Sequence, residues 1–213
     1  MITLIGDTHG FEFDKIKNNI ESDYIIVLGD FGFKGKNLIK LNNMLKKSNC
    51  ILLFVDGNHE WYNKLKKCKT IDMFNGKVDK YSEKIFRLRR GEVYTIENKI
   101  FLTFGGAKSI DKVYKIAENS WFQEEEYNNE EYNKLYNNII KYNYEFDYIL
   151  SHDGPYEIVK QIYIRDIEPS KTSYLLDNIR KNCKFKNWYF GHHHMDKQIL
   201  NFKCLYDTYE KIY

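Results

Sequence analysis

The first sixty residues alternate between short apolar runs and amphipathic stretches, and each apolar run ends in a polar motif. The apolar runs are Ile2 to Ile5, Tyr24 to Leu28 and Ile51 to Val55, and residues such as Leu38 and Leu41 recur between them at helical spacing. Strands that alternate with helices indicate βαβ units and a parallel sheet. Because ligands of such sheets bind outside the carboxyl ends of the strands, we expect the motifs to converge at one edge.

All six histidines of the chain lie in short motifs that carry glycine or aspartate. The motifs are Gly6-Asp7-Thr8-His9-Gly10, Gly29-Asp30, Gly57-Asn58-His59-Glu60, Ser151-His152-Asp153-Gly154 and Gly191-His192-His193-His194. Imidazole and carboxylate groups that converge from separate loops are the donors that bind transition metals. The pattern therefore predicts a metal site. Histidines placed only as core filler would not all stand beside turn-forming glycines.

The later part of the chain predicts a β-hairpin, a helical insertion and further strands. Residues 92–104 form the expected hairpin, and the segment at about 107–146 reads as an insertion whose helix begins after Asn128. We expect one domain over residues 1–213, with this insertion overhanging the site and shaping substrate choice. Two apolar runs at 147–150 and 187–190 deliver the last two histidine motifs.

The chain is also expected to close with a hairpin over residues 199–202 and 203–206. In the Trp121-Phe122 pair, packing is a better interpretation than a base-stacking platform.

Composition restricts the function classes. Lys and Arg number 33 against 30 Asp and Glu, and a net charge of +3 is too small to indicate nucleic-acid binding by charge alone. This charge balance is compatible with an anionic substrate, which needs only a local positive site. The four cysteines show no paired spacing, which favours reduced thiols over disulfides. With no leader-like segment and no apolar run of bilayer length, we expect a cytoplasmic protein that does not enter a membrane.

The ordered set D-x-H, G-D, G-N-H-E, H and G-H-x-H resembles the calcineurin-like metallophosphoesterase superfamily, and it extends from residue 7 to residue 194. The segments 105–112 and 120–122 are similar to small bacterial and phage members. The resemblance implies an α/β fold, a four-layer sandwich of two mixed β-sheets flanked by helices. It also implies metal-dependent hydrolysis of phosphate esters.

The resemblance further implies a ligand set for two divalent ions. Two such ions about 3.5–4 Å apart repel each other, so a negative ligand must lie between them. By similarity, Asp30 is the bridge, Asp7, His9 and His194 complete the first site, and Asn58, His152 and His192 complete the second. A mixture of imidazole, carboxylate and amide donors favours Mn²⁺, with Fe or Zn²⁺ as alternatives, over Mg²⁺ alone.

The chemistry implied is attack on phosphorus by a metal-bridging hydroxide, because metal-bound water is acidified to near neutrality. Asn58 and His59 are then the catalytic residues, with His59 protonating the leaving oxygen, and Lys34 joins them in binding substrate. Protein phosphatases of this superfamily read G-D-x-V-D-R-G, whereas this chain has Phe33 and Lys34 in place of the second Asp and the Arg. Lysine cannot grip phosphate bidentately, so we expect phosphodiesters rather than phosphoproteins as substrates.

Alternatives stay open at this point. The substrate could be a nucleotide or a nucleic acid, and the oligomeric state is unknown. The chain could be a phosphomonoesterase or protein phosphatase of the same fold, a non-catalytic metal-binding scaffold, or a nucleic-acid-binding module. His59 could be structural because its carboxylate partner is missing. His193 is expected to point away from the metals, although a shift in register would exchange it with His192 or His194.

Overall fold

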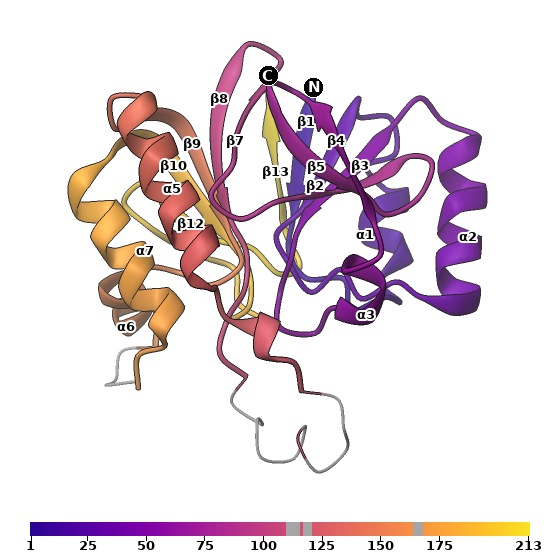
Figure 1. Cartoon of the computed structure of the whole chain (residues 1–213). Helices are drawn as coiled ribbons and strands as arrows, with labels where there is room; N and C mark the ends of the chain where they lie inside the picture. The colour runs from indigo at the N-terminus through magenta and orange to yellow at the C-terminus, as the bar shows by residue number, and fades with distance from the viewer. Residues whose placement is uncertain (110–115, 117–120, 164–167) are drawn as a thin grey trace.

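The chain folds into four layers, with two mixed sheets packed face to face and helices outside each sheet (Figure 1). The computed structural model describes residues 1–109, 116, 121–163 and 168–213. The α/β sandwich with two mixed sheets is therefore confirmed.

The first sheet has seven strands in the order β13-β1-β2-β3-β6-β5-β4. Their bounds are β1 Ile2–Ile5, β2 Tyr24–Val27, β3 Ile51–Val55, β4 Lys69–Met73, β5 Gly76–Lys80, β6 Ile85–Leu88 and β13 Tyr209–Ile212. Strands β1, β2, β3 and β6 are parallel to their neighbours in that series, whereas β13 and β5 pair antiparallel. The pairing of β13 with β1 brings the two ends of the chain together at the edge of the sheet where β1 begins (Figure 1).

The second sheet has six strands in the order β11-β12-β10-β9-β8-β7. Their bounds are β7 Val93–Ile96, β8 Lys99–Phe104, β9 Glu145–Ser151, β10 Lys184–Phe190, β11 Lys197–Ile199 and β12 Phe202–Cys204. The hairpin expected over residues 92–104 is confirmed as β7 and β8. The closing hairpin also exists, but its predicted strand bounds were wrong. Its turn falls at the exposed Leu200, whose φ of 53° is left-handed and cannot continue a strand.

Helices cover the outer face of each sheet (Figure 1). On the first sheet these are α1 Phe13–Lys17, α2 Gly35–Lys46 and α3 Tyr62–Leu65; on the second they are α5 Asn129–Lys141, α6 Tyr156–Tyr163 and α7 Lys171–Asn182. Asn128 caps α5 as expected, because its side chain accepts a hydrogen bond from the backbone N–H of Glu131 at 2.9 Å. Among the described residues, no helix is both long enough and apolar enough to cross a bilayer.

Three apolar layers hold the sandwich together, one between the sheets and one under each group of helices. Successive residues of the central strands serve different layers. Leu4 and Leu53 face the second sheet, whereas their neighbours Ile5 and Phe54 pack under α1 and α2. Burial on both faces explains why these strands are continuous apolar runs in the sequence rather than alternating patterns.

The helix of the expected insertion belongs to the outer layer of the second sheet. Leu135 and Ile139 of α5 are buried in the same cluster as Leu102 and Phe104 of β8. Residues 110–115 and 117–120 of that segment lie outside the described residues. The single-domain boundaries and the influence of the insertion on substrate choice stay predictions.

The polar motifs meet at one edge of the sandwich, as the strand pattern indicates. They follow the carboxyl ends of β1, β2, β3, β9 and β10, which are parallel strands drawn from both sheets. In Figure 1 this edge lies at the bottom, opposite the two ends of the chain. The fold thus places five loops at the mouth of the space between the sheets.

Candidate metal centre

The first group of possible ligands consists of Asp7, His9 and His194, whose donor atoms lie within 4.8 Å of one another. Oδ2 of Asp7 is 3.2 Å from Nε2 of His194 and 3.8 Å from Nε2 of His9. Asp7 is fully buried, whereas the side chain of His194 is 48% exposed. Asp7 therefore lies on the side of the group that is shielded from water, whereas His194 lies on the side open to solvent.

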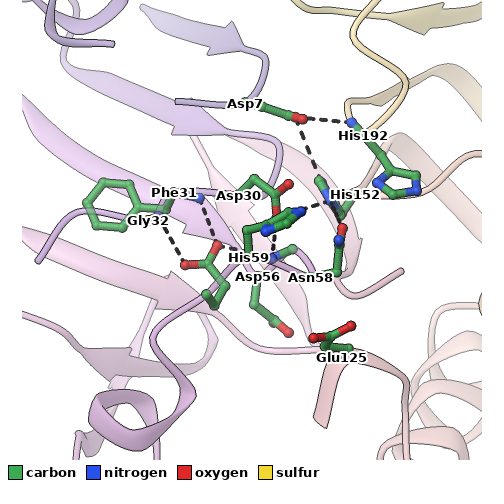
Figure 2. Close-up of polar contacts among 12 residues, drawn as sticks. Asp7, Asp30, Phe31, Gly32, Asp56, Asn58, His59, Glu125, His152 and His192 are labelled. Carbon is green, nitrogen blue, oxygen red and sulfur yellow. Dashed lines mark hydrogen bonds and ion pairs between the residues drawn. The ribbon is translucent and has the colours of Figure 1, made fainter. Parts of the chain in front are cut away.

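The second group consists of Asp30, His152 and His192, again with donor atoms within 4.8 Å of one another. Asn58 joins it, because its Oδ1 lies 3.0 Å from Nε2 of His152. Oδ1 of Asp30 is 3.4 Å from the same nitrogen. Figure 2 shows Asp30, Asn58 and His152 pointing toward one another.

A backbone carbonyl fixes the tautomer of His152. Nδ1 of this buried ring lies 2.8 Å from the carbonyl oxygen of Leu28, and a carbonyl can only accept a hydrogen bond. Nδ1 therefore carries the hydrogen, and in the neutral ring Nε2 presents a lone pair to Oδ1 of Asn58 and Oδ1 of Asp30. Three acceptor atoms facing one another require a proton or a metal cation among them.

Asp7 offers a second buried oxygen suited to a cation. Its Oδ1 accepts a hydrogen bond from the backbone N–H of His192 at 3.1 Å, but its buried Oδ2 accepts no hydrogen bond from the described residues. Burial opposes ionisation of this carboxyl, yet the imidazoles of His194 and His152 outweigh it and lower the pKa of Asp7 to about 2. A buried, ionised oxygen without a donor costs free energy unless a cation approaches it.

Asp30 lies between the two groups. Its Oδ1 faces His152, and its Oδ2 lies 4.0 Å from Nδ1 of His9. The backbone N–H of His59 also donates to Oδ1 at 2.7 Å. Gly57 is required here, because a Cβ at that position would overlap Oδ1 of Asp30. The carboxylate of Asp30 thus faces both groups of possible ligands.

Four of these side chains are carried on left-handed backbone. The φ angles are 46° at His9, 45° at Asp30, 66° at His192 and 49° at His194. Each such conformation costs on the order of 1–3 kcal/mol for a residue other than glycine and persists only where the surroundings enforce it. The strain is concentrated at the point where the loops converge.

Comparison with known proteins agrees with this geometry. A family model described as calcineurin-like phosphoesterase matches residues 1–196.

The chain belongs to the calcineurin-like phosphoesterase family.

A search of curated proteins found no match to it. The donor set of this phosphoesterase fits divalent metal ions, because its carboxylate, imidazole and amide donors converge with an orphaned buried oxygen among them. The two Asp–His groups could each hold one ion, with Asp30 between them.

The remaining predicted site residues of the phosphoesterase lie at the edge of this centre or away from it. The ring of His59 is exposed and lies edge-on to His9, with centroids 5.7 Å apart; among the described residues no carboxylate hydrogen-bonds to it. Lys34 is exposed at the start of α2, and its side chain forms no hydrogen bond or ion pair with the described residues. Phe33 is buried against Phe13 and Phe31, with ring centroids 5.0 Å apart in each pair. This position is therefore part of the hydrophobic core rather than of the candidate site.

His193 points away from the two groups, as expected. Its Nε2 is 3.1 Å from Oδ1 of Asp153, and its Nδ1 is 3.2 Å from the hydroxyl of Tyr163. Asp153, His192 and His193 form a third group of possible ligands. However, Asp153 already accepts hydrogen bonds from the hydroxyl of Ser170 and from a backbone N–H. We therefore assign His193 and Asp153 to supporting the loop that carries His192.

Glu60 has a role that the sequence did not reveal. Its buried carboxyl accepts hydrogen bonds from the backbone N–H groups of Phe31 at 2.8 Å, Gly32 at 3.2 Å and Gly57 at 3.2 Å. It thereby ties the loop after β2 to the loop after β3. Burial and the charge of Asp30 raise the pKa of Glu60 to about 7, although the three N–H groups act in the opposite direction.

Replacing Glu60 should loosen both loops. We expect Glu60→Ala to lower the free energy of unfolding by roughly 3 kcal/mol, because three N–H groups lose their acceptor. Glu83→Ala is the control, since Glu83 is exposed and its carboxylate forms a surface ion pair with Lys46. Urea titrations would measure both variants, and equal stability of the two would contradict this role.

The pH dependence of stability should reverse when metal is added. In the metal-free chain, burial lowers the pKa of His152 but the Asp30 and Asp7 carboxylates raise it above 6.5, and Asp7 likewise raises the pKa of His194. A raised histidine pKa stabilises the fold at low pH, and this contribution is lost as pH rises through that pKa. We expect the melting temperature in chelator to fall from pH 6.5 to roughly 8, and to rise over that range with Mn²⁺.

A melting temperature with the same pH slope in chelator and in Mn²⁺ would show that protons and metal do not compete for these imidazoles.

Proposed function

We propose that this phosphoesterase hydrolyses phosphodiesters with two bound divalent ions, and that Mn²⁺ is the preferred ion. One observation carries the proposal. The two oxygens of Asp30 face different histidine groups, at 3.4 Å from His152 and 4.0 Å from His9, as a bridge between two cations requires. The mixture of carboxylate, imidazole and amide donors suits Mn²⁺, with Fe or Zn²⁺ as alternatives.

When bound, two divalent ions supply Lewis acidity that acidifies a water nucleophile and offsets charge on the phosphate oxygens. The chain supplies the geometry. Asp7 and Asp30 provide the negative charge that holds two cations close together, and buried His152 is fixed in the tautomer that leaves Nε2 free to bind. The carbonyl of Asn58 adds a neutral ligand, so the donor set does not become too negative to accept an anionic phosphate.

His59 is the proposed proton donor to the leaving oxygen. It is exposed, it lies beside His9, and its backbone N–H is fixed by Asp30. Imidazole is the side chain used most often for proton transfer in catalysis. No carboxylate among the described residues hydrogen-bonds to this ring.

The phosphodiester preference rests on charge. A phosphomonoester carries close to two negative charges at neutral pH, because its second pKa is about 6, whereas a diester carries one. A bidentate arginine is the side chain best suited to a dianion, but Phe33 and Lys34 occupy the positions concerned. Two metal ions and one lysine fit a singly charged diester better.

The proposed substrate class is a nucleotide or a short nucleic acid. Phe11 is 60% exposed, and its ring is nearly parallel to that of the candidate ligand His9, with centroids 6.2 Å apart. An exposed aromatic ring beside the reaction centre offers a base a surface to stack on. A cytoplasmic location is part of the same proposal, and the free thiols of all four cysteines agree with it.

A metal-resolved rate comparison tests the proposal. With Mn²⁺ we expect faster hydrolysis of a bis-aryl phosphate than of the corresponding mono-aryl phosphate, with 2′,3′-cyclic nucleotides as a third arm. Faster monoester hydrolysis would instead identify a phosphomonoesterase. Tight metal binding without hydrolysis of any arm, under Mn²⁺, Fe and Zn²⁺ alike, would identify a non-catalytic scaffold.

His59→Ala should separate proton donation from metal binding. General acid catalysis contributes about 10²–10⁴-fold, and it matters most when the leaving oxygen is basic. We expect a loss of that order for a diester with an alkyl or nucleoside leaving group, and a much smaller loss for a nitrophenyl leaving group. An equal loss for both leaving groups would rule out the role of proton donor.

A further inference from the structure

Two buried polar residues lie beside Asn58 and come from the segment that follows β8. Ser109 is 2% exposed and Glu125 is 1% exposed. Glutamate is almost never buried this fully unless it has a partner. Figure 2 places Glu125 on the side of Asn58 away from Asp30. Neither residue belongs to the two Asp–His groups, so their burial calls for a separate explanation.

A hydrogen-bond chain connects the two residues to the candidate ligand. Nδ2 of Asn58 donates to Oγ of Ser109 at 3.0 Å, and Oγ of Ser109 lies 2.5 Å from Oε2 of Glu125. The hydroxyl of Ser109 donates to this carboxyl oxygen, so its hydrogen points to Glu125. The lone pairs of the hydroxyl then face Asn58 and select its NH₂ group.

The direction of this chain decides which atom of Asn58 faces the histidines. The two ends of an asparagine amide have nearly the same shape, and only their hydrogen bonds distinguish them. With NH₂ held by Ser109, Oδ1 is the atom 3.0 Å from Nε2 of His152. The opposite orientation would present an NH₂ group to that nitrogen, and an NH₂ group cannot bind a cation.

Backbone contacts hold the same segment against the loop that carries Asn58. The N–H of Gly106 donates to the carbonyl of Asp56 at 2.7 Å, and the N–H of Ala107 donates to the carbonyl of Glu125 at 3.0 Å. A Cβ at Gly105 would overlap that same carbonyl of Asp56. The glycine pair at the end of β8 therefore permits a close approach of the two loops.

A buried arginine, Arg90, stabilises this contact between the two loops. Nε of Arg90 donates to Oδ2 of Asp56 at 2.8 Å, and its Nη2 donates to the carbonyl of Glu124 at 2.6 Å. The same Nη2 donates to the hydroxyl of Tyr62, which in turn donates to the carbonyl of Gly57 at 2.5 Å. Arg90 thus joins Asp56 and Tyr62, which lie on either side of Asn58 in the sequence, to the segment that carries Glu125.

We infer that Ser109 and Glu125 are positioning residues that keep the carbonyl oxygen of Asn58 turned toward the second metal ion. The inference rests on the proposed two-metal function. Residues that orient metal ligands typically change metal affinity or activity by about 10–100-fold when they are replaced. The expected defect therefore lies in the binding of one ion of the pair.

Calorimetric titration of the full-length protein with Mn²⁺ tests this inference without relying on activity. Wild type should bind two ions. Ser109→Ala should bind one ion with wild-type affinity and the other about 10–100-fold more weakly, because the amide loses its anchor. Ser109→Thr retains the hydroxyl and should restore most of the affinity. Glu125→Gln should weaken the same ion about 10-fold, since an amide no longer dictates the direction of the chain.

Ser22→Ala is the matched control. Its hydroxyl is also buried and bonds to Thr3 at 2.7 Å, but it stands just before β2, at the end of the sandwich opposite the motif loops. We expect its two Mn²⁺ affinities to equal those of wild type. If Ser109→Ala does not fold, Glu125→Gln and Ser109→Thr carry the same comparison.

The outcomes distinguish failure of the positioning role of Ser109 and Glu125 from failure of the proposed two-metal function. Wild-type affinities for both ions in Ser109→Ala and in Glu125→Gln would overturn the positioning role and leave the proposed function standing. A wild-type protein that binds no Mn²⁺ would overturn both. Equal weakening of both ions in Ser109→Ala would mean a general loss of structure at the site and would also overturn the inference.

Discussion

The structure is organised around a convergence of lone pairs from carboxylate, amide and imidazole groups. Oδ1 of Asp30, Oδ1 of Asn58 and Nε2 of His152 face one another, and the buried Oδ2 of Asp7 lies 3.2 Å from Nε2 of His194. In a dry site such an arrangement is unfavourable unless cations offset it. The surrounding hydrogen bonds, left-handed loops and glycines hold these acceptors together despite that cost.

Support for this cluster comes from two layers of interaction. Glu60 binds the backbone of the loops after β2 and β3, which sets the distance between Asp30 and Asn58. Further out, the buried ion pair of Arg90 with Asp56 fixes the end of β3 to the segment after β8. The first layer positions the loops. The second positions the segment whose Ser109 hydrogen-bonds to the side-chain amide of Asn58. Both depend on buried charges held by hydrogen bonds or ion pairs, because a buried charge is tolerated only where it is paired.

The sequence predicted the parts of this structure that strong local patterns encode. Strands such as Ile51–Val55 are apolar on both faces, and polar motifs after parallel strands must meet at one edge, so the parallel α/β arrangement and the gathering of the histidines were predictable. The sandwich of two mixed sheets was implied by the family resemblance. Strands β4, β5 and β13 were not predictable from local patterns. Lys69–Met73 is largely exposed and mostly polar, and Tyr209–Ile212 pairs with β1, which lies more than two hundred residues away in sequence. Long-range pairing of weakly patterned edge strands leaves little local signal.

The same distinction applies to the candidate site. Motif order identified the residues that converge, but the roles of Glu60, Ser109 and Glu125 depend on which backbone or side-chain atoms meet in space. A buried glutamate cannot be told from a solvated one when both stand in acidic or polar stretches of sequence. The run Glu124-Glu125-Glu126 reads as a solvated face, yet Glu125 is buried.

The central claim is that Asp30 lies between two metal ions. Crystals grown with Mn²⁺, with anomalous scattering measured at the manganese absorption edge, test it most directly. The account predicts two anomalous peaks about 3.5–4 Å apart on either side of the Asp30 carboxylate, one beside Asp7, His9 and His194 and the other beside Asn58, His152 and His192. A single peak, or none, in fully soaked crystals would contradict it.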